Sequence, residues 1–137
     1  MNTRKPLHDA AHRGDADKVR ELIRSGANVN AIDEFKNTPL HFAVGKGHET
    51  IVQLLLENGA EVNSANEDFW TPLYLAATEN RPRIAEILLL NGAQINSADD
   101  KCRTPLDLAQ YLHRQEVIKI FLQHGGLQQT QCRQDVL

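Results

Sequence analysis

Histidines, serines and cysteines carry the chemistry that this 137-residue chain can offer, and their spacing limits what they can do. His8 and His12 stand four residues apart, which puts them on one face of a helix and suits a metal ion. A third ligand and a glutamate placed as a general base are both missing from their surroundings. The pair therefore gives little support for a zinc site.

Nucleophilic catalysis has equally little support. Cys102 stands between Lys101 and Arg103, and cationic neighbours favour the reactive thiolate form of a cysteine. An incidental surface cysteine explains the same pattern and is the interpretation we favour. The serines, Ser25, Ser64 and Ser97, lack the glycine-flanked setting of a catalytic serine, and no phosphate-binding glycine loop is present. The sequence therefore predicts a protein that is not an enzyme and holds no cofactor or metal.

Composition argues against several other classes of protein. Hydrophobic residues make up 41% and charged residues 24%, which is ordinary for a folded domain. The net charge of -3 gives no electrostatic basis for nucleic-acid binding, and no apolar run reaches the roughly 18 residues of a membrane-spanning helix. Two cysteines are too few for a disulfide scaffold, and the charged start at Arg4 and Lys5 does not fit a secretory signal. We therefore expect a cytoplasmic protein with no membrane insertion and no direct nucleic-acid partner.

The elements that must position these side chains follow from an internal repeat. Prolines recur every 33 residues, at Pro6, Pro39, Pro72 and Pro105. Leucine follows each proline directly, and alanine stands four places after it. Glycines recur with the same period, at Gly26, Gly59, Gly92 and Gly125. Two adjacent apolar residues occupy the fourth and third positions before each glycine. When the sequence is written as four segments of 33 residues, these recurring residues align in several columns. This alignment indicates a repeat architecture.

Each column predicts a structural element. Threonine before proline, as at Thr38-Pro39, is typical of a helix N-cap followed by the first helical residue. A second helix follows, with apolar residues at helical spacing, for example Ile51, Leu54 and Leu55. The glycine after it suits a left-handed residue at the helix end, although Asn58-Gly59 alone is also compatible with a hairpin turn. Because such short helix pairs cannot hide their apolar faces alone, they must stack.

These columns resemble the ankyrin repeat family. Residues 38–43 read Thr-Pro-Leu-His-Phe-Ala, the full signature of that family, and Gly47-His48 and Gly59-Ala60 continue its pattern. The resemblance implies an all-α solenoid of stacked helix-turn-helix units with hairpin-like turns. It implies a domain over 1–126, with repeats near 4–32, 33–65, 66–98 and 99–126, the outer two resembling capping repeats. Residues 127–137, rich in glutamine, are expected to form a flexible tail.

Three departures from the family pattern stand out. The hairpin tips usually carry glycine two places before the threonine, and here Lys36, Phe69 and Cys102 stand there. Left-handed backbone is costly for these residues, so the turn geometry is expected to differ. In the third unit, Asn80-Arg81 replaces Gly-His, and asparagine still tolerates a left-handed turn. Tyr74 replaces the signature histidine, so we expect a local adjustment there.

The resemblance also implies a function: binding another protein through the hairpin tips and the inner face of the first helices. Ten residues are the candidate contacts: Phe35, Asn37, Lys46, Glu67, Asp68, Trp70, Glu79, Lys101, Arg103 and Tyr111. Phe35 and Trp70 either form paired aromatic anchors or pack locally on their hairpins. The acidic residues around them favour a basic partner surface. A monomer acting as adaptor, inhibitor or scaffold is expected, with a stabilising subunit of a larger complex as the alternative.

Overall fold

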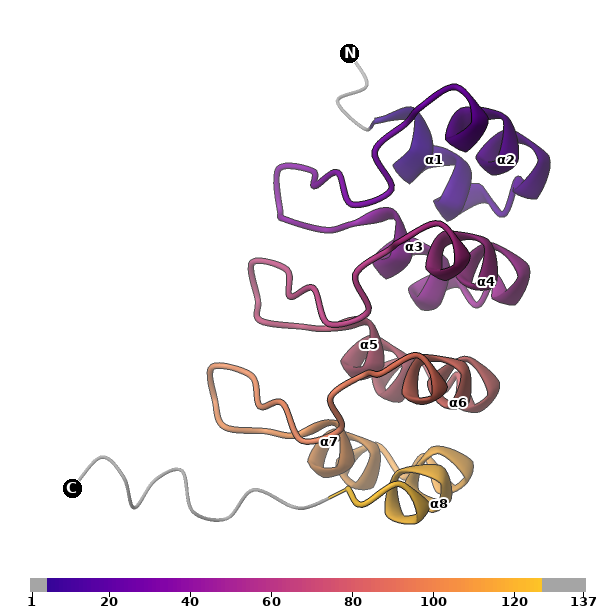
Figure 1. Ribbon diagram of the computed structural model, residues 1–137. Helices are drawn as coiled ribbons and strands as arrows, with labels where there is room; N and C mark the ends of the chain where they lie inside the picture. Colours follow the sequence, from indigo (N-terminus) through magenta and orange to yellow (C-terminus); the bar gives the residue numbers. More distant parts are fainter. Residues whose placement is uncertain (1–4, 127–137) are drawn as a thin grey trace.

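The computed structural model describes residues 5–126 and contains eight helices in four consecutive pairs (Figure 1). The helices are α1 (Pro6–Arg13), α2 (Ala16–Arg24), α3 (Pro39–Lys46), α4 (Glu49–Glu57), α5 (Pro72–Thr78), α6 (Pro82–Leu90), α7 (Pro105–Tyr111) and α8 (Gln115–Gln123). Units 1 to 4 denote these pairs in chain order. No strand occurs within the described residues. The predicted all-α solenoid is confirmed.

The first helix of units 2, 3 and 4 begins as the threonine–proline pattern predicts. Thr38, Thr71 and Thr104 are the N-caps of α3, α5 and α7, and each hydroxyl accepts a hydrogen bond from the backbone N–H three residues later. Proline follows as the first helical residue, where its missing N–H costs nothing. Helix α1 has Lys5 at this position and no side-chain cap.

The turn between the two helices of each unit is closed by a residue with left-handed backbone. Gly14, Gly47, Asn80 and His113 take φ values of 79°, 78°, 56° and 59°. The prediction for Asn80 is therefore confirmed. At Gly47 a Cβ atom would lie 2.8 Å from the guanidinium carbon of Arg81, so this glycine also makes room for a neighbour.

That neighbour ties successive units together. The Arg81 guanidinium donates to the Gly45 carbonyl at the end of α3, at 3.0 Å. One unit earlier, His48 occupies the equivalent position and donates to the His12 carbonyl. One unit later, Arg114 does so and donates to the Thr78 carbonyl. These bonds satisfy helix carbonyls that have no partner within their own helix.

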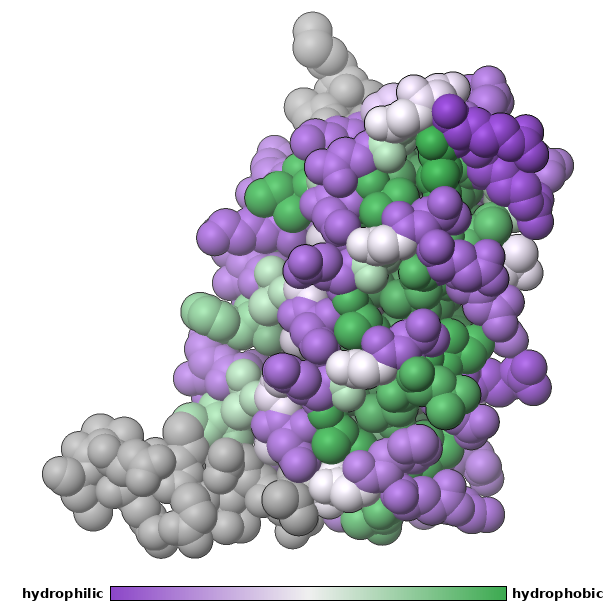
Figure 2. Space-filling model, in the orientation of Figure 1, coloured by the Kyte–Doolittle hydropathy of each residue, from purple (hydrophilic) through white to green (hydrophobic). Residues whose placement is uncertain are grey.

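The helices stack in two layers. The first helices pack in the order α1, α3, α5, α7, and the second helices in the order α2, α4, α6, α8. The core runs between the layers, and Leu55 and Leu88 are fully buried in it. The predicted left-handed residues after the second helices are confirmed, since all four glycines have φ between 84° and 91°. Hydrophobic surface gathers along the second helices and the segments after them, and the tip side is more hydrophilic (Figure 2).

Candidate binding surface at the tips and first helices

Three loops project from one side of the stack (Figure 1), and each is closed over five residues in the same way. We call residues 33–37, 66–70 and 99–103 the first, second and third tip. In the first tip, the Asp33 carboxylate accepts hydrogen bonds from the backbone N–H groups of Phe35 and Asn37, at 2.9 and 2.8 Å. Asn66 and Asp99 do the same for their own tips. A bond from the first N–H to the last carbonyl closes each loop.

The fourth residue of each tip keeps left-handed backbone without glycine. Lys36, Phe69 and Cys102 have φ of 63°, 65° and 63°. The expectation that the missing glycines change the turn geometry is therefore wrong. The side-chain bonds of Asp33, Asn66 and Asp99 hold the loop in shape and offset a backbone cost on the order of 1 kcal/mol per tip.

Histidines bridge the first two junctions between units. His8 donates from Nε2 to the Asn37 carbonyl at 2.9 Å, and His41 donates to the Trp70 carbonyl at 2.9 Å. The Nδ1 atom of His41 also accepts from the Thr38 N–H, so its neutral form is required. Burial lowers the pKa of both histidines because it disfavours the charged imidazolium. We call these contacts the histidine junctions.

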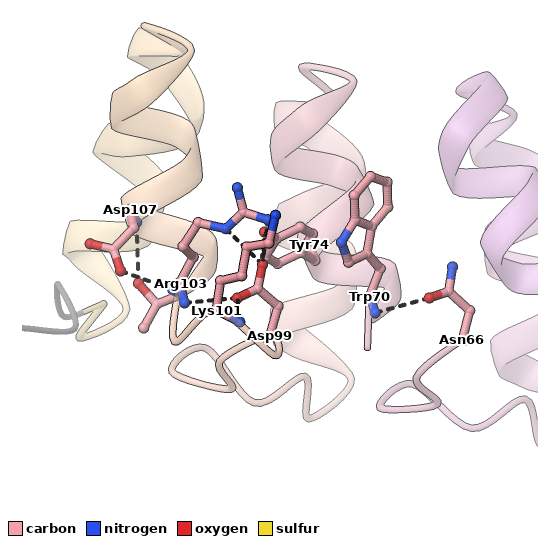
Figure 3. A network of polar contacts seen from close by, with 8 residues as sticks. Asn66, Trp70, Tyr74, Asp99, Lys101, Arg103 and Asp107 are labelled. Atoms are coloured by element: carbon pink, nitrogen blue, oxygen red, sulfur yellow. Dashed lines mark hydrogen bonds and ion pairs between the residues drawn. The ribbon is translucent and has the colours of Figure 1, made fainter. Parts of the chain in front are cut away.

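The third junction uses different chemistry, which we call the tyrosine junction. The Tyr74 hydroxyl donates to Oδ2 of Asp99 at 2.5 Å, and Nε of Arg103 donates to the same oxygen at 2.8 Å (Figure 3). The Asp99 side chain is fully buried. Burial alone opposes its charge, but the hydrogen bonds from Tyr74 and Arg103 outweigh it and lower the pKa of Asp99. Burial, followed by the nearby carboxylate, raises the pKa of Tyr74.

The first and second tips and the first helices of units 1 to 3 line an open pocket of about 390 Å³, which we call the second-tip pocket. Five of the ten predicted contact residues line it: Asn37, Lys46, Asp68, Trp70 and Glu79. Trp70 is half-buried, and its ring stands beside that of Tyr74, with centroids 5.3 Å apart (Figure 3). Phe42 and Leu75 add apolar wall.

The other five predicted residues lie outside this pocket. Phe35 is 56% exposed in the first tip, and its carbonyl accepts from the Glu67 N–H of the second tip, at 2.9 Å. Lys101 is exposed in the third tip, and Arg103 is held by Asp99. Tyr111 is 81% exposed at the end of α7. Phe35 and Trp70 occupy different positions in their tips, so they do not form an equivalent pair.

Sequence reasoning missed two kinds of residue. Asp33, Asn66 and Asp99 recur at the period of 33 and carry the side chains that shape the tips. That column was visible in the sequence. Phe69 was treated only as a replacement for glycine, and it proves 56% exposed at the second tip. Its position in the tip gave no signal for this exposure.

The described residues show little that supports other chemistry. Within residues 5–126 no group of three or more histidine, cysteine, aspartate or glutamate side chains is arranged to hold a metal ion. Over the same range, every helix is too short to cross a bilayer. The predicted tail at 127–137 lies outside the described residues.

Comparison with known proteins accounts for the repeat. A model of ankyrin repeats in three copies matches residues 7–99 and 64–132. No match was found among curated proteins. Ankyrin repeats generally serve as protein–protein interaction modules and are typically non-catalytic. Because the matched residues span nearly the whole sequence, the chain belongs to the ankyrin repeat family.

Proposed function

We propose that this protein is a non-catalytic interaction module, an adaptor, inhibitor or scaffold, that binds a protein partner through its tips and the inner face of its first helices. The observation that carries the proposal is the exposure of Phe35 and Phe69, each 56% exposed at consecutive tips. Aromatic side chains, phenylalanine included, are enriched in protein–protein interfaces relative to the rest of the protein surface.

The backbone of the tips supports the same function. Each loop is closed by side-chain and backbone bonds, so its shape is set before a partner arrives. The bond between the Glu67 N–H and the Phe35 carbonyl also joins the first tip to the second. A preorganised surface loses little conformational entropy on binding, which favours affinity.

The test combines capture with a matched control. Partners captured from lysate and identified by mass spectrometry are retested with Phe35→Ala/Phe69→Ala and with Leu90→Ala/Leu122→Ala. The control pair removes leucines that are 74% and 56% exposed on α6 and α8. We expect the tip variant to weaken binding at least about tenfold while its melting temperature stays close to that of the parent. Equal weakening by the control would contradict the assigned surface.

A further inference from the structure

The second-tip pocket combines apolar walls with unpaired charge. Its walls include the rings of Phe42 and Trp70 and the side chain of Leu75. Asp68 and Glu79 also line it, and both are exposed. Among the described residues, neither carboxylate takes part in an ion pair or a side-chain hydrogen bond. An occupant therefore meets aromatic side chains, the carboxylate of Asp68 in the second tip and that of Glu79 after the end of α5.

Most other polar groups lining the pocket already have partners. Both ring nitrogens of His41 are used, by Trp70 and Thr38. The amide groups of Asn37 and Asn66 bond to each other, at 3.0 Å. The Gly45 carbonyl accepts from Arg81. The carboxylates of Asp68 and Glu79 are thus the main acceptors left for a ligand.

The charged residues around the pocket determine whether a cationic or an anionic ligand fits it. Asp68 and Glu79 carry two negative charges among the lining residues, and the Arg81 guanidinium is already held on the Gly45 carbonyl. Lys46 is the one lysine or arginine among the lining residues of the described chain. Because acidic groups outnumber this lysine, a cationic side chain fits better than an anionic one. An apolar side chain would desolvate the carboxylates without offering them a donor.

The aromatic wall favours arginine over lysine. A guanidinium is planar, stacks on an indole ring and can donate to a carboxylate through two N–H groups, whereas an ammonium is a compact and strongly hydrated charge. We infer that the second-tip pocket binds an arginine side chain of a protein partner, stacked on Trp70 and held by Asp68 and Glu79. This inference rests on the proposed function and names the chemistry of the partner at that surface.

Trp70 provides a site-specific signal, because it is the only tryptophan in the sequence. The probes are peptides of the form acetyl-Gly-Ser-X-Ser-Gly-amide, with X as arginine, citrulline, lysine or glutamate. NMR titration at pH 7.5 follows the Trp70 indole resonance. We expect a saturable shift with arginine, and binding about tenfold weaker or more with citrulline, which keeps the shape and loses the charge.

Charge variants assign the signal to the two carboxylates. Asp68→Asn/Glu79→Gln should weaken binding of the arginine peptide at least about tenfold. The matched control, Glu57→Gln/Glu86→Gln, changes net charge equally on the exposed surface of α4 and α6 and should leave binding within about twofold. Lys46→Met should strengthen binding, because it removes the like charge at the pocket.

Three results with the peptides would overturn the inference. Equal binding of citrulline would mean that the pocket recognises shape alone, and equal binding of lysine would remove the role of the planar guanidinium. Preferential binding of the glutamate peptide, lost in Lys46→Met, would assign the pocket to acidic side chains. The proposed function is tested separately: a captured partner that is lost with Phe35→Ala/Phe69→Ala but kept with Asp68→Asn/Glu79→Gln would uphold the module and reject the arginine pocket.

Discussion

The histidine junctions and the tyrosine junction each join the first helix of one unit to the tip that follows it, but the histidines must be neutral whereas Asp99 must be charged. In the first two, a neutral imidazole reaches the last backbone carbonyl of the next tip. In the third, the Tyr74 hydroxyl donates to the carboxylate of Asp99, the first residue of the third tip. This carboxylate must stay charged and needs Arg103 beside it. One repeat position thus accepts two chemistries, provided that the facing tip supplies the matching acceptor.

The largest loss of stability is expected from substitutions in the core that both kinds of junction share. Leu55→Ala in α4 and Leu88→Ala in α6 each empty a fully buried site, and we expect each to cost about 2–5 kcal/mol of unfolding free energy. Urea unfolding measures the loss. Leu90→Ala, 74% exposed in the same helix as Leu88, serves as the control and should change stability by less than about 0.5 kcal/mol. Wild-type stability in both core variants would contradict this packing.

The next variant breaks the tyrosine junction alone. Asp99→Ala removes two backbone caps, the partner of Tyr74 and the partner of Arg103, so we expect a loss of about 2–4 kcal/mol. Solvent limits the contribution of the ion pair to this loss, because the Arg103 side chain is 42% exposed. Asp33→Ala removes the equivalent caps at the first tip without the buried network, and should cost about 1–2 kcal/mol. Equal losses, compared by thermal unfolding, would show that the network adds nothing.

A smaller substitution isolates the contribution of the Tyr74 hydroxyl to stability. Tyr74→Phe keeps the ring beside Trp70 and leaves the buried Asp99 without one donor, so we expect a loss of about 1–2 kcal/mol. Tyr74→Phe combined with Asp99→Ala should lose less than the sum of the two single variants. Strict additivity in chemical denaturation would mean that the two side chains are not coupled.

The smallest expected effect separates the junctions by pH. His8 and His41 have lowered pKa values when folded, so the unfolded chain binds protons first. Their contribution is complete above the ordinary histidine pKa of 6.5 and is lost progressively as the pH falls below it. Asp99 also has a lowered pKa, so its contribution is lost only as the pH falls below the ordinary aspartate value of 3.8.

Melting temperatures between pH 7.5 and 5 measure the histidine effect. His8→Ala and His41→Ala, made singly, should each flatten the decline, although both variants start from lower stability. Asp99→Ala should leave the decline over this range unchanged. A decline that persists undiminished in both histidine variants would assign it to other groups.

The sequence predicted the repeat because one pattern returns every 33 residues. It predicted the threonine caps and the left-handed glycines because each depends on residues within a few positions of one another. The geometry of the tips was mispredicted, since glycine was judged necessary and the recurring Asp33, Asn66 and Asp99 column was not recognised as its substitute. The partnership of Tyr74 with Asp99 spans 25 residues and depends on side-chain reach, which periodicity does not encode. The pocket, likewise, arises only when three units stack.

The tips also have a practical consequence for protein engineering. Their shape depends on the first residue and on main-chain bonds, while the second and third residues of all three tips are exposed. Randomising positions 34, 35, 67, 68, 100 and 101 would therefore give a display library in which sequence diversity is separated from foldability. Selection from such a library would sample new binding specificities on one constant scaffold.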